Sequence, residues 1–144
     1  MKPWIYLILA LAVLAACSKK ASSSYVISAF NDSAISGTAV LQQVTHTKSQ
    51  LILSLNGLED GKNYQAAIYR GSPGETLPEN VFVELGLIEE GALSRYLNKT
   101  AQNLPLSYQD LSSLQGYIAI IKVSTETIDG TSTTVKKLVA SGMF

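Results

Sequence analysis

The chain has 144 residues, a length typical of a single domain. Its 11 basic and 11 acidic side chains cancel, and 15% of its residues are charged. This balance argues against a nucleic-acid partner, which needs a basic surface, and against a disordered chain, which combines high net charge with low hydrophobicity. The one cysteine excludes a disulfide scaffold, and the one histidine excludes a metal site built on two or more imidazoles. We expect no metal and no other cofactor.

Residues 1–16 have the parts of a secretory signal peptide. Lys2 supplies a positive charge near the start, and residues 4–16 form an uncharged, mostly apolar run. A run of this length matches the hydrophobic region of a signal peptide and is short for a bilayer span. The pattern therefore predicts that residues 1–16 direct export and are then removed.

The apolar run ends in Leu14-Ala15-Ala16-Cys17, which resembles the lipobox of bacterial lipoproteins. In that family small residues such as Ala15 and Ala16 fit the signal peptidase, and the cysteine thiol receives diacylglycerol. The resemblance implies cleavage before Cys17 and a lipid anchor, palmitate included, in the cell envelope. It also implies the outer membrane, because Ser18 stands where an aspartate favours inner-membrane retention. An ordinary secretory signal and a plain transmembrane anchor are the alternatives.

The segment after the cysteine is polar and short. Lys19, Lys20 and three serines at 22–24 are typical of a flexible linker. We therefore expect residues 17–24 to be the lipidated N-terminus with its tether, and residues 25–144 to be the folded domain. The lysine pair could contact anionic headgroups, although two charges are more often a solvated linker.

Short apolar runs separated by turn residues predict an all-β domain. The run at 117–123 is almost continuously apolar, which is typical of a central strand. Ser107 and Asp110 match a helix-start pattern, and Asp129-Gly130 matches a hairpin turn. Together they predict an antiparallel β-sandwich of seven to eight strands, with one short helical turn near 107–115, and the resemblance given below implies that its topology is a Greek key. The expected strands are 25–30, 37–47, 50–55, 64–69, 80–88, 91–100, 117–123 and 133–144.

Three stretches resemble CHRD domains, which are related in pattern to copper/zinc superoxide dismutase-like Greek-key sandwiches. They are a Gly-Leu turn with its following strand at 56–74, a helical turn and buried strand at 106–123, and the end of the chain at 140–144. The resemblance implies the same sandwich fold. A generic sandwich, such as an immunoglobulin-like one, is the alternative.

The chain departs from that family where its members often bind metal. The family's His-x-His positions correspond here to Ala67 and Tyr69, and the region of a later histidine holds Ile120 and Ile121. None of these side chains can ligate copper or zinc as an imidazole does. The metal chemistry of the wider superfamily is therefore not expected here.

No other constellation points to catalysis. His46 lies near an expected hairpin end without a second group to orient it, which is typical of an exposed polar residue. Glu84, Glu89 and Glu90 lack the spacing of a calcium loop and are expected to be solvated charge. We therefore predict no catalytic residues and no enzymatic activity.

Tyrosine is the one mildly informative residue type. Such side chains are favoured in binding surfaces, although in sandwiches they are more often buried. After the signal, six remain: Tyr25, Tyr64, Tyr69, Tyr96, Tyr108 and Tyr117. The sequence favours a lipid-anchored, non-catalytic envelope module that binds or supports an envelope protein or glycan. A binder of glycans or small ligands through a tyrosine patch, and an enzyme or metal-binding relative with an unrecognised site, are the alternatives.

Overall fold

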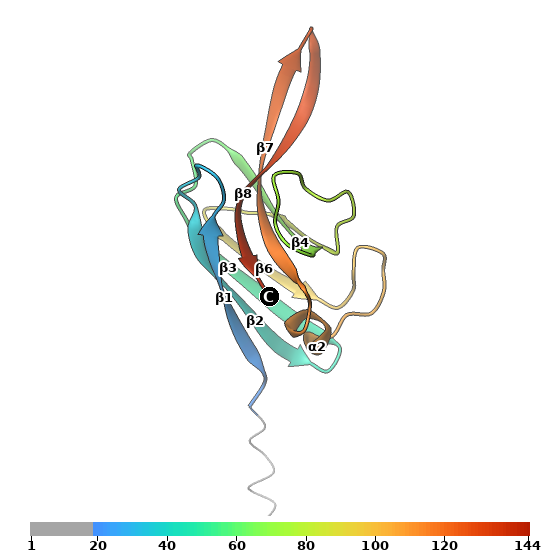
Figure 1. Ribbon diagram of the computed structural model, residues 1–144. Helices are drawn as coiled ribbons and strands as arrows, with labels where there is room; N and C mark the ends of the chain where they lie inside the picture. The colour runs from blue at the N-terminus through green and yellow to red at the C-terminus, as the bar shows by residue number, and fades with distance from the viewer. Residues whose placement is uncertain (1–18) are drawn as a thin grey trace, which may run out of the picture.

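The computed structural model describes residues 19–144, so the predicted signal peptide, the lipobox and Cys17 lie outside the described residues. The predicted all-β antiparallel fold is confirmed, with eight strands and one short helix among residues 19–144 (Figure 1). The elements are β1 (Ser22–Ala29), β2 (Ser36–Thr45), β3 (Lys48–Asn56), β4 (Asn63–Arg70), β5 (Val83–Leu87), β6 (Ala92–Leu97), α2 (Tyr108–Ser112), β7 (Gly116–Ile128) and β8 (Thr131–Met143).

The strands form one nearly closed sheet in the order β5-β4-β7-β8-β1-β2-β3-β6. β1 joins the two halves of the sandwich, because residues 22–27 pair with β2 whereas Ser28 and Ala29 pair with β8. The two end strands, β5 and β6, approach each other at a bridge between Glu89 and Ala92. Since β4, β5 and β6 follow one another and β7 returns beside β4, the connection is a Greek key.

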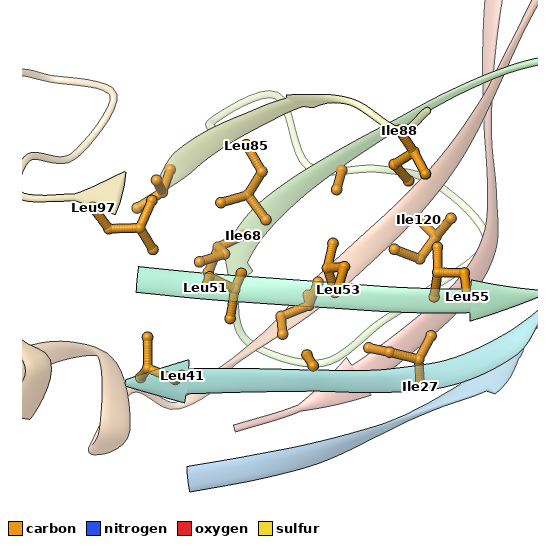
Figure 2. Close-up of a cluster of buried hydrophobic side chains, with 14 of the residues drawn as sticks. Ile27, Leu41, Leu51, Leu53, Leu55, Ile68, Leu85, Ile88, Leu97 and Ile120 are labelled. Atoms are coloured by element: carbon orange, nitrogen blue, oxygen red, sulfur yellow. The ribbon is translucent and has the colours of Figure 1, made fainter. Parts of the chain in front are cut away.

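The core forms where alternating apolar side chains of both halves meet. Leu51, Leu53 and Leu55 on β3 all point inward, as expected for side chains that alternate along a strand. Figure 2 shows them facing Ile68 of β4 and Ile120 of β7 across the interior. Burial of these side chains from opposite halves holds the sandwich together.

β7 is buried on both of its faces as it runs between β4 and β8. Ile118 and Ile120 point into the main core, and Tyr117, Ala119 and Ile121 belong to a second cluster on the outer face of the sheet. A strand covered on both sides needs a continuous apolar run. This confirms residues 117–123 as a central strand.

The predicted helix start is also confirmed. Ser107 is the N-cap of α2: its Oγ accepts a hydrogen bond from the Asp110 amide (3.2 Å), and its own amide donates to the Asp110 carboxylate (2.8 Å). Hydrogen bonds from the Ser107 side chain and backbone hold the pKa of the Asp110 carboxyl below its usual value. The first helical residue, Tyr108, is hydrogen-bonded to Ser23 through its hydroxyl (2.7 Å), which ties α2 to the start of β1.

The structure corrects the expected tether. Residues 22–24, which we assigned to the linker, pair with residues 40–42 of β2 and belong to β1. The Gln43 amide also donates to the Ala21 carbonyl (2.8 Å). Main-chain hydrogen bonds between strands do not depend on the identity of the side chains. Pairing with the edge of β2 therefore makes residues 22–24 a strand, although these serines have no apolar pattern.

β7 and β8 continue past the sandwich as a two-stranded ribbon, residues 124–135, which we call the β7–β8 arm (Figure 1). β4 pairs with β7 only as far as Val123, and β1 pairs with β8 only at Ala140 and Ser141. The tip is the predicted hairpin turn, where Asp129 and Gly130 both have positive φ. The arm itself was not expected, because the sequence predicted that β7 would end at 123.

Substitution of a β7 core residue tests this architecture. Ile120→Ala removes part of a fully buried side chain, so we expect the free energy of unfolding to fall by about 2–5 kcal/mol, and Ile118→Ala should act alike. Ile128→Ala is the matched control on the same strand, because Ile128 is 58% exposed, and it should change stability by less than about 0.5 kcal/mol. Denaturant titration measures all three. Losses below about 1 kcal/mol at both core positions would contradict a central β7.

Candidate functional site

The positions matched to the family's metal-binding histidines lie in an apolar cluster. Ala67, Tyr69 and Ile121 come together on the outer face of β4 and β7, whereas Ile120 points into the main core. The structure thus brings together three of the four positions. Across residues 19–144 there is no group of three or more histidine, cysteine, aspartate or glutamate side chains that could hold a metal ion. At Ala67, Tyr69 and Ile121 the outer face is therefore a packing surface.

Two tyrosines stack within this outer cluster. The rings of Tyr69 and Tyr117 lie 5.7 Å apart between centroids, at 23° between planes. Burial raises the pKa of both hydroxyls, and the neighbouring carboxylate of Glu84 raises that of Tyr69 further. The Tyr117 hydroxyl is buried and has no hydrogen-bond partner in the described part of the chain. A buried hydroxyl without a partner is destabilising.

A pair of tyrosine-to-phenylalanine variants tests this assignment. Tyr117→Phe removes an unpaired buried hydroxyl, so we expect the free energy of unfolding to stay the same or rise. Tyr108→Phe breaks the hydrogen bond to Ser23, so we expect a loss of about 1 kcal/mol. Thermal or chemical denaturation compares the two. A clear loss of stability in Tyr117→Phe would show that its hydroxyl has a partner after all.

The residues considered for catalysis lie apart and exposed. His46 is in the turn between β2 and β3, exposed to solvent. Glu84 lies on β5, and Glu89 and Glu90 lie at the tight turn that leads into β6. Glu90 has a φ of 50°, which fits a turn residue. All three carboxylates face solvent, as expected for surface charge.

The tyrosines do not form a binding patch. Tyr64, Tyr69, Tyr108 and Tyr117 are buried, and Tyr25 is half-buried with its ring against Phe144 (4.9 Å between centroids). Among residues 19–144 the one exposed tyrosine is Tyr96, at 58% exposure, and the Lys48 ammonium lies over its ring at 4.2 Å from the centroid. The described residues therefore contradict a three-tyrosine patch for glycan binding.

A charged cavity of about 290 Å³ lies at the end of the sandwich from which the arm leaves. The loop of residues 30–35, Tyr64, Lys122 and Lys137 line it. Glu59 also lines it, and the Lys122 ammonium donates to its carboxylate at 2.7 Å. This ion pair lowers the pKa of Glu59 and raises that of Lys122. The cavity joins residues from distant parts of the chain, so no single motif in the sequence indicated it.

The β7–β8 arm is the most exposed part of the described structure that has regular backbone. Its outer face carries only hydroxyl side chains, and its other face mixes hydroxyl, acidic and aliphatic ones. The outer-face residues are Thr125, Thr127, Ser132 and Thr134. No strand among residues 19–144 pairs with either outer edge of the arm. Unpaired strand edges can accept a further strand through main-chain hydrogen bonds, so the arm is a candidate interaction surface.

The arm also carries a charge gradient along its length. Its tip holds two acidic residues, Glu126 and Asp129, and its base holds Lys136 and Lys137. The sequence predicts a turn at Asp129 and a strand that contains Lys136 and Lys137, and it assigns Glu126 to no element. In the folded chain the acidic residues lie at the tip of the arm and the lysines at its base, at opposite ends of the ribbon (Figure 1).

β1 begins at the end of the molecule opposite to the arm. β1 runs antiparallel to β8 and pairs with it at Ser28 and Ala29, so Ser22 lies beyond the C-terminal end of β8. The arm tip lies at the other end, where β8 begins (Figure 1). At about 3.3 Å per residue along β1 and β8, Ser22 and the tip are roughly 50 Å apart. The sandwich therefore separates the two ends as a compact spacer.

Comparison with known proteins does not add a relative. No family model, curated protein or solved structure matches this chain. Within residues 19–144, no helix is long and apolar enough to cross a membrane. The arm is the candidate site because its two outer edges are unpaired among the described residues.

Proposed function

We propose that this chain is a lipid-anchored protein of the cell envelope, with the outer membrane favoured. Its β-sandwich is a non-catalytic module that holds the β7–β8 arm away from the membrane to bind another envelope component. The observation that carries the proposal is the placement of the start of β1 and the arm at opposite ends of the sandwich. A module built in this way presents its binding edge to the space beyond the membrane surface.

The anchor follows from the lipobox-like Leu14-Ala15-Ala16-Cys17 segment. Two or three acyl chains hold a protein stably on a bilayer, whereas one chain binds only marginally. β1 begins at Ser22, so few residues separate an acylated Cys17 from the folded domain. The sandwich would then rest close to the membrane, with the arm on its far side.

The fold supports a distant likeness to CHRD and copper/zinc superoxide dismutase-like domains. The Greek-key order of the strands agrees with that likeness. The packing of Ala67 and Tyr69 in the outer cluster supports a structural use of the positions that correspond to metal-binding histidines in those domains. The separation of His46 from the exposed glutamates supports a role in binding rather than catalysis.

The anchor is tested by Cys17→Ala. We expect the variant to lose palmitate labelling and to be found either as soluble protein or as an unprocessed precursor, because the acyl-accepting thiol is gone. Metabolic labelling and membrane fractionation measure the two effects. Ser24→Ala, a change downstream of the cleavage site, is the control and should remain lipidated. Palmitate on the Cys17→Ala protein would contradict the lipobox assignment.

The binding role is tested by shortening the arm. Replacing residues 125–134 with Asn-Gly keeps a tight hairpin turn and removes the exposed ribbon. We expect the crosslinks that this protein forms with its envelope partner in intact cells to be lost. The free energy of unfolding of the sandwich should change little, because a two-stranded ribbon on its own is only marginally stable. Replacement of the exposed β2–β3 turn residues His46 and Thr47 by Asn-Gly is the control. Crosslinks that survive without the arm would show that binding occurs elsewhere.

A further inference from the structure

We propose that the partner of the β7–β8 arm is a second copy of this chain, whose arm pairs with it in antiparallel fashion along β8. This inference rests on the proposed binding role of the arm. Because antiparallel arms point in opposite directions, the contact joins copies anchored on facing membranes, or copies released in detergent, and not two copies standing upright on one bilayer. The unpaired edge of β8 in one copy would bind the same edge of β8 in the other. Such a contact is isologous, because each copy contributes the same edge.

The β8 edge is the better of the two edges for adding a strand. It is free from Thr131 to Leu138, since the nearest main-chain contact on that side is the Phe30 amide donating to the Val139 carbonyl (2.9 Å). The β7 edge is free only from Ser124 to Ile128. Edge strands are commonly protected by proline, a bulge or charged side chains, lysine above all, and on this edge the lysines are confined to its base at Lys136 and Lys137. Residues 131–135 have none of these and contain only threonine, serine and valine.

The charge gradient selects an antiparallel pair of arms. Glu126 and Asp129 mark the tip, and Lys136 and Lys137 mark the base of β8. When two arms pair in opposite directions, the acidic tip of each copy lies beside the basic base of the other, and two-fold symmetry makes the contact twice. A parallel arrangement would instead bring like charges together. The base of the β7 edge lacks this match, because Lys122 is already paired with Glu59 at 2.7 Å.

Strand geometry also restricts the register. Directly opposite residues in a sheet point to the same face, so a two-fold pair of identical strands is centred on a residue rather than between two residues. Centring the pair on Thr134 or on Val135 overlaps equal lengths of the free edge, but only the Thr134 register pairs Thr131, next to the acidic tip, with Lys137 of the second copy. The two ribbons then form a four-stranded sheet. Three or more strands are generally needed for a sheet to be stable in water, whereas two are marginal.

Disulfide trapping tests the pairing. Thr134→Cys places the two thiols opposite each other, at the Cα separation of about 4.5–5.5 Å that a disulfide accepts. Thr125→Cys is the matched control, because Thr125 lies opposite Thr134 within one hairpin and on the same face. In the proposed dimer its two copies are three strand spacings apart, about 14 Å, which is too far for a disulfide. Both variants are made in the full-length chain with Cys17 retained, purified from membranes in detergent and mildly oxidised.

We expect Thr134→Cys to shift from monomer to disulfide-linked dimer on a non-reducing gel, while Thr125→Cys and the parent chain stay monomeric. Reversing Lys136 and Lys137 to glutamate in the Thr134→Cys chain should lower the dimer fraction. Reversing Glu126 and Asp129 to lysine as well should restore it, which also shows that the arm still folds.

Two results would overturn the inference. One is monomeric Thr134→Cys protein, and the other is equal dimer formation by the two cysteine variants, which would indicate random collision. If arm-dependent crosslinks to a different protein are then found in cells, self-pairing is wrong and the proposed binding role stands. If removal of the arm changes no crosslink of any kind, the proposed role of the arm is wrong as well.

Discussion

β7 changes character between Val123 and Ser124, and the arrangement of the whole molecule depends on that change. Up to Ile121 the strand is buried on both faces and hydrogen-bonded to β4 and β8, and its side chains are apolar. β4 still pairs with Lys122 and Val123, but from Ser124 onward β7 has one strand partner and two solvated faces, and four of its five side chains are polar, Ile128 being the exception. A strand buried on both faces can organise a sandwich, and the same strand without cover can extend from it as an arm.

The sequence predicts the sandwich well because its signals are local. Alternation at Leu51, Leu53 and Leu55, the Ser107–Asp110 cap and the Asp129-Gly130 turn each follow from neighbouring residues, and the structure confirms them. The two departures have one cause. Residues 22–24 and 124–128 have no apolar face that a sequence pattern could reveal. They form strands because main-chain hydrogen bonds pair them with a neighbouring strand.

The candidate site was less predictable than the fold. His46 and the exposed glutamates belong to residue types that can act in catalysis or bind metal. In the folded chain they lie apart on the surface. The arm carries no catalytic motif. It is a candidate interaction surface because its edges have unpaired main-chain groups and because its acidic and basic residues lie at opposite ends. Both properties depend on which strands pair over what length, and pairing is a property of the whole sheet.

In the proposed function the anchored end and the binding end of the molecule lie on opposite sides of the sandwich. Energy transfer from a fluorophore to acceptor-labelled lipid headgroups tests it directly, with the donor placed at position 20 or at position 129 of the membrane-bound protein. A strand rises about 3.3 Å per residue, so the two positions should differ in height above the bilayer by roughly 50 Å. We expect strong transfer from position 20 and weak transfer from position 129. Strong transfer from position 129 would place the arm at the membrane and contradict the proposed orientation.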